Sequence, residues 1–122
     1  MAEKKYFFNG RKIKGIQMVT VIPDISRERE FSELKNQLFN YVSNSPDNGY
    51  CLDFSKVKNF NYVSNSISVM MNFNRYCVNN NKKCYFVSNS KLKPFLEKSH
   101  LVDTLFKGNV FDSKEQLENF IL

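Results

Sequence analysis

The chain of 122 residues is poor in several residue types: it has no tryptophan, four glycines, three cysteines and a single histidine, His100. So few glycines leave little material for a glycine-rich phosphate-binding loop. Three cysteines cannot form a closed set of disulfides. Cys51, Cys77 and Cys84 all lie in apolar runs, where thiols are usually buried and inert. We therefore expect a protein that is not an enzyme and has no cofactor and no metal site.

Long apolar runs are also absent. No run approaches the ~20 residues of a membrane-spanning helix. The opening Met-Ala-Glu-Lys-Lys-Tyr has no long apolar core behind its lysines, so we expect no signal peptide. Together with the odd number of cysteines, this predicts a cytoplasmic protein in a reducing compartment.

The composition that remains is that of a globular protein. Hydrophobic residues make up 42% and charged residues 25% of the chain, and no stretch has the composition of a linker. A length of 122 residues suits one domain, so we expect a single domain over residues 1–122.

The net charge of +6 raises the alternative of a basic nucleic-acid-binding domain. However, the lysines and arginines are scattered, and no block of five or more occurs. Heavy use of Lys, Asn, Phe, Tyr, Ile and Ser is what an AT-rich coding sequence produces without selection on charge. Nucleic-acid binding is therefore the weaker alternative.

Strand-like segments recur along the chain. Residues 16–22 are β-branched and alternating, and residues 50–54 and 83–87 are short apolar runs. Asn9-Gly10 is a strong turn signal after the apolar run 5–8, so the first two strands should form a hairpin that turns there. Residues 109–111 form a possible last strand.

Helical patterns separate these strands. Four sets of apolar residues have helical spacing. They are Phe31, Leu34, Leu38, Tyr41 and Val42; Ile67, Met70, Met71, Phe73 and Cys77; Leu92, Phe95 and Leu96; and Leu117, Phe120 and Ile121. Ser64 is the expected N-cap of the second helix. The order predicts an α/β fold, a mixed central sheet of four to five strands with helices packed on it.

From Tyr50 onward the sequence resembles the STAS domain family, the anti-sigma-factor antagonists. Leu52-Asp53-Phe54-Ser55 is similar to the family's Leu-Asp-Leu-Ser strand, and residues 64–68 stand where its Asp-Ser-Ser-Gly-Leu-Gly segment begins a helix. In that segment Asn65 replaces a serine, Ser66 and Ser68 replace glycines, and the aspartate corresponds to residue 62 or 63. Residues 96–106 are similar to the segment that leads to the family's Leu-Phe pair.

The resemblance implies a non-catalytic bacterial regulator of transcription that binds proteins. In the family, the unphosphorylated domain binds an anti-sigma factor that is also a serine kinase, and phosphorylation of the loop serine breaks the complex. Ser64 and Ser66 are the candidate phosphorylation sites. The implied partner-binding residues are Asp24, Ile25, Asp53, Ser64, Asn65, Ser66 and Ser68.

Two questions stay open at this point. Asp53 is either functional or a cap on the loop that follows its strand. The chain is either a switching module or a non-switching STAS subunit of a lipid-transporting ABC system.

Overall fold

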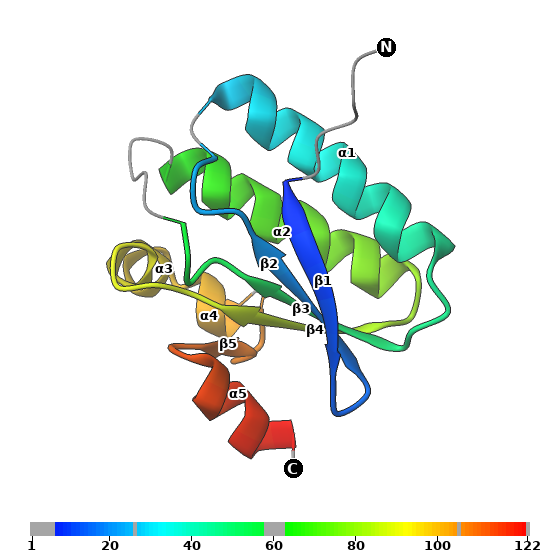
Figure 1. The fold of residues 1–122 in the computed structure, drawn as a ribbon. Helices are drawn as coiled ribbons and strands as arrows, with labels where there is room; N and C mark the ends of the chain where they lie inside the picture. The colour runs from blue at the N-terminus through cyan, green and yellow to red at the C-terminus, as the bar shows by residue number, and fades with distance from the viewer. Residues whose placement is uncertain (1–6, 26, 58–62, 105, 122) are drawn as a thin grey trace.

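The computed structural model describes residues 7–25, 27–57, 63–104 and 106–121, and Figure 1 shows their arrangement. Ten elements follow one another along these residues. They are β1 (Phe8–Ile13), β2 (Ile16–Val21), α1 (Glu28–Asn44), β3 (Gly49–Asp53), α2 (Val63–Asn79), β4 (Lys83–Val87), α3 (Leu92–Ser99), α4 (Leu101–Thr104), β5 (Val110–Phe111) and α5 (Lys114–Ile121).

The strands form one mixed sheet in the order β1-β2-β3-β4-β5. β1 and β2 are antiparallel, and the other three pairs are parallel. This confirms the predicted α/β fold class. Because right-handed crossovers between sequentially ordered parallel strands lead to one face of the sheet, α1 and α2 lie together over that face. α5 covers the other face.

β3 lies at the centre and is buried on both faces. Tyr50 and Leu52 belong to the larger core cluster, with side chains of α1, α2 and α3. Cys51 belongs to the smaller cluster, with Leu117 of α5. The short apolar run of the sequence is therefore a strand, as predicted, and it lies at the centre of the sheet.

α1 packs as its sequence pattern predicts. Phe31, Leu34, Leu38 and Val42 are all buried, and Tyr41 is half-buried. At the N-terminus of the helix, the Glu30 carboxylate accepts a hydrogen bond from the backbone N–H of the capping residue Arg27 at 3.0 Å. One free donor of the first turn is satisfied in this way.

The predicted hairpin turn at Asn9-Gly10 is wrong. Both residues lie within β1, and the chain turns instead at Lys14 and Gly15, between the paired residues Ile13 and Ile16. Lys14 has φ 51° and Gly15 has φ 83°. A two-residue turn with positive φ at both positions matches the right-handed twist of the strands, and glycine adopts it without strain. Of the run 5–8, residues 5 and 6 lie outside the described residues.

Three residues of the predicted apolar helical stripes are exposed. Met71, Phe95 and Phe120 have exposed fractions of 42%, 51% and 59%. Each belongs to an apolar helical stripe of which other residues are buried. Helical spacing therefore identified the stripes but not their edges.

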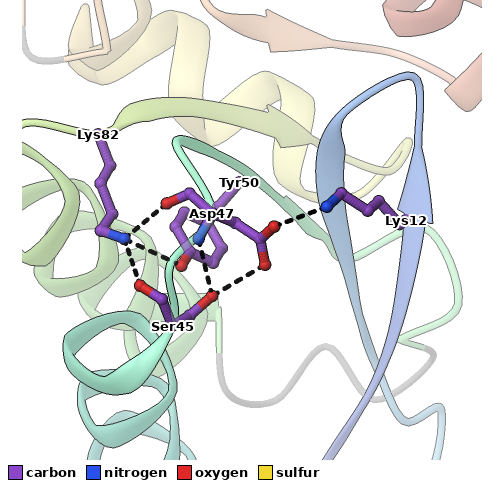
Figure 2. A network of polar contacts seen from close by, with 5 residues as sticks. All are labelled: Lys12, Ser45, Asp47, Tyr50 and Lys82. Atoms are coloured by element: carbon purple, nitrogen blue, oxygen red, sulfur yellow. Dashed lines mark hydrogen bonds and ion pairs between the residues drawn. The ribbon is translucent and has the colours of Figure 1, made fainter.

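A network of polar contacts joins β1, the loop between α1 and β3, and the residue before β4 (Figure 2). The Lys82 ammonium donates to the carbonyl oxygens of Ser45 (2.7 Å) and Asp47 (2.5 Å) and lies 3.4 Å from the Tyr50 hydroxyl. Asp47 in turn pairs with Lys12 of β1 at 2.9 Å. The Lys12 ammonium, helped by the Ser45 hydroxyl, holds the pKa of the Asp47 carboxyl below its usual value. One cation thus joins the α1–β3 loop to the start of β4.

We expect Lys82→Met to lower the free energy of unfolding by about 1–3 kcal/mol, because two carbonyl groups lose a charged donor. The neighbouring Lys83 is exposed, so Lys83→Met is the matched control and should change stability by less than about 0.5 kcal/mol. Urea unfolding of both variants measures the difference. Equal effects of the two substitutions would contradict a special role for Lys82.

Candidate functional site

Most of the residues that the sequence singled out gather at one edge of the sheet. β2 and β3 are parallel, with Thr20 paired to Asp53, so the loop after β2 and the connection after β3 leave at the same edge. The first of these leads into α1 and the second into α2, and both helices start on that side in Figure 1. Carboxyl edges of parallel strands are a common place for binding sites. The connection over residues 58–62 lies outside the described residues.

Asp53 is fully buried at this edge, with an exposed fraction of 0%. One carboxylate oxygen accepts the backbone N–H of Ser55 at 2.8 Å, and the other accepts the Thr20 hydroxyl at 3.3 Å. The Lys114 ammonium of α5 lies 3.8 Å from the second oxygen. Asp53 therefore joins β2, the loop after β3 and α5.

These contacts decide between the two interpretations of Asp53. It caps its own loop, and its side chain is not accessible to a partner, so its assignment as a partner-binding residue is corrected. Burial raises the pKa of the neighbouring Cys51 thiol well above its usual value, and the Asp53 carboxylate adds to this shift. Cys51 is thus held as a neutral thiol.

The loop after β2 presents one of its two candidate residues. Asp24 is exposed, whereas Ile25 has an exposed fraction of 0% and packs in the larger core cluster. Ile25 anchors the loop through its apolar side chain. It is therefore corrected from a partner-binding residue to a core residue.

Ser64 is exposed and lies in the first turn of α2. The expectation that it is the N-cap is wrong, because the helix already begins at Val63. Val63 is half-buried and packs against the larger core cluster. The capping position is residue 62, which is also one of the two residues compared with the family's aspartate. It lies outside the described residues.

The next residues of α2 differ in exposure. Ser66 points into the protein and has an exposed fraction of 2%. A kinase cannot reach a hydroxyl in that position in the folded chain. The assignment of Ser66 as a phosphorylation and partner-binding residue is therefore corrected: it is a buried residue of α2. Asn65 and Ser68 are half-buried. Of the two candidate serines, only Ser64 is accessible.

A groove of about 690 Å³ runs along α2 from Ser64. Its lining combines apolar and polar side chains of α2 with one residue of the α4–β5 loop. The lining residues are Ser64, Ile67, Ser68, Met71, Asn72, Asn74, Arg75, Val78 and Lys107. Met71 and Val78 are exposed by 42% and 62%. Sequence periodicity could have identified this groove. Ser64, Met71 and Val78 follow one another at intervals of seven residues, so they share one face of a helix.

The groove carries charge of one sign. Arg75 and Lys107 are both exposed, and they are the only charged side chains among its described lining residues. The Arg75 guanidinium donates to the Asn72 side chain at 2.5 Å. Within the described part of the chain, neither cation forms an ion pair with a carboxylate.

A second hollow, of about 350 Å³, lies at the ends of β4 and β5. It is lined by His100, Glu97 and Asp112 among others, and Asp112 pairs with Lys93 at 2.9 Å. Among the residues that the structure describes, no three histidine, cysteine, aspartate or glutamate side chains stand close enough to share a metal ion. None of the helices described here has the length and apolar character needed to cross a membrane.

No family model matches the chain, and no curated protein matches it either.

The contacts of Asp53 lead to a stability prediction. Asp53→Ala should lower the free energy of unfolding by about 1–3 kcal/mol, since Thr20 and the Ser55 N–H each lose a buried acceptor. Asp53→Asn should lower it less, because the amide oxygen still accepts one of these bonds. Chemical denaturation of the wild type and both variants tests this. A loss below about 0.5 kcal/mol for Asp53→Ala would show that the carboxylate is dispensable.

Proposed function

We propose that the chain is a non-catalytic protein-binding module of the anti-sigma-factor-antagonist type, whose partner binds at Ser64 and along α2. Phosphorylation of Ser64 would switch this binding off. The observation that carries the proposal is the exposed Ser64 hydroxyl at one end of an uncovered apolar groove. The partner of this type is an anti-sigma factor that is also a serine kinase.

The position of Ser64 suits a phosphate. Free backbone N–H groups and the positive end of the helix dipole stabilise negative charge in the first turn of a helix. A phosphoryl group adds about −1.5 to −2 charge at neutral pH. Such a group would leave α2 folded and change the surface that a partner meets.

Two of the thiols are poorly suited to nucleophilic catalysis. Burial raises the pKa values of Cys51 and Cys84 well above the usual thiol value, and a hydrogen bond with Cys77 adds to the shift at Cys84. Neutral, buried thiols are poor nucleophiles.

The proposal is tested with the wild type, Ser64→Asp and the control Ser32→Asp, because Ser32 is an exposed serine near the start of α1. Each protein is used to capture partners from the native cell, and the captured proteins are identified by mass spectrometry. We expect one partner to bind the wild type and Ser32→Asp, and to bind Ser64→Asp at least about tenfold more weakly, or about 1.4 kcal/mol. The melting temperature of Ser64→Asp should not fall, since aspartate suits the first turn.

One result would contradict the switch. If the three proteins capture the same partners with the same affinity, Ser64 has no regulatory role and the non-switching alternative gains support. If Ser64→Asp loses both the partner and its cooperative melting transition, the lost binding reflects unfolding.

A further inference from the structure

We infer that the groove of α2 binds an acidic amphipathic helix of the partner protein. This inference deepens the proposed function, on which it rests for the existence of a partner. It specifies the chemistry of the segment that the partner presents.

The shape and apolar content of the groove suit a helix. From Ser64 to Val78 the face of α2 spans 15 residues, whose 14 intervals of about 1.5 Å give a length of about 21 Å. Ile67, Met71 and Val78 give it apolar contacts along this length. An amphipathic helix of about four turns would cover it with apolar side chains spaced i, i+3, i+4 and i+7. Methionine, which is flexible and polarisable, adapts well to such contacts.

The charge of the groove selects the kind of helix. Arg75 and Lys107 line the groove together with the apolar residues, and neither pairs with a carboxylate in the described part of the chain. The whole chain has a net charge of +6, which attracts acidic partners over a longer range. Complementary charges across an interface favour the right partner and raise the cost of a like-charged one.

A second copy of this chain is a poorer occupant. In a two-fold interface centred on the groove, each groove would meet the groove of the copy, so Arg75 and Lys107 would face cations rather than carboxylates. Like charges brought together in this way oppose association. Charge complementarity therefore favours a different, acidic protein.

The same electrostatics connect the groove to Ser64. A phosphate on Ser64 would place negative charge at one end of the groove, where it repels an acidic helix. Modification and binding would thus exclude one another without any change of fold.

The test uses two synthetic helical peptides of about 18 residues, long enough to be partly helical in water. Both carry leucines at i, i+3, i+4 and i+7, and the remaining positions are mainly glutamate in one and lysine in the other. Fluorescence anisotropy with the full chain measures their affinities at low salt. We expect the acidic peptide to bind at least about tenfold more tightly than the basic one. Amide NMR shifts on binding should map to α2 and Lys107.

Variants identify the surface. Met71→Asp should weaken the acidic peptide at least about tenfold, and Arg75→Glu should remove the preference for the acidic peptide. Phe95→Asp is the control, because Phe95 is an exposed apolar residue of α3 that does not line the groove. The Phe95→Asp variant should bind the acidic peptide with the same affinity as the wild type. Melting curves confirm that each variant is folded.

Several results would overturn the inference. They are no binding of the acidic peptide, equal binding of both peptides, no effect of Met71→Asp, or binding to phosphatidylserine vesicles in place of the peptide. These failures are separate from failure of the proposed function. If Ser64→Asp loses the captured partner but the acidic peptide does not bind, the proposed switch stands and the inference about the groove is wrong. If the acidic peptide binds but Ser64→Asp captures the same partners as the wild type, the inference about the groove stands and the proposed switch is wrong.

Discussion

All five residues of β3 are buried, and the rest of the structure depends on covering this strand on both faces. β2 and β4 pair with its edges, α1 and α2 cover Tyr50 and Leu52, and α5 covers Cys51. A strand buried in this way excludes water from both sides, so every polar group near it needs a partner within the protein. Asp53 and Lys82 meet this need at opposite ends, through bonds to Thr20, the Ser55 N–H and the loop carbonyls.

The sheet order explains why α2 presents a free face. Sequential parallel strands with right-handed crossovers send α1 and α2 to the same side, so α2 has β3 and β4 beneath it and α1 beside it. Its outward face, from Ser64 to Val78, has no covering element among those described. The fold thus places an accessible serine and an apolar groove on one helix, whose opposite side packs in the core through buried residues such as Val69 and Phe73.

Local patterns predicted the elements better than the site. The α1 stripe and the apolar run of β3 identify their structures because helical and strand periodicity are local properties. The turn prediction at Asn9-Gly10 was wrong because the position of a turn also depends on which residues of the two strands pair. The burial of Ile25, Asp53 and Ser66 depends on elements far away in the sequence, such as α5 for Asp53. The Lys82 contacts span 35 and 37 residues, which no local pattern reveals.

The central claim is that Ser64 controls binding while the fold stays unchanged. The most direct measurement is calorimetric titration of the captured partner onto the chain that carries phosphoserine at position 64, with the unmodified chain beside it. The account predicts at least about tenfold weaker binding of the phosphorylated chain at an unchanged melting temperature. Equal affinities of the two chains would contradict it.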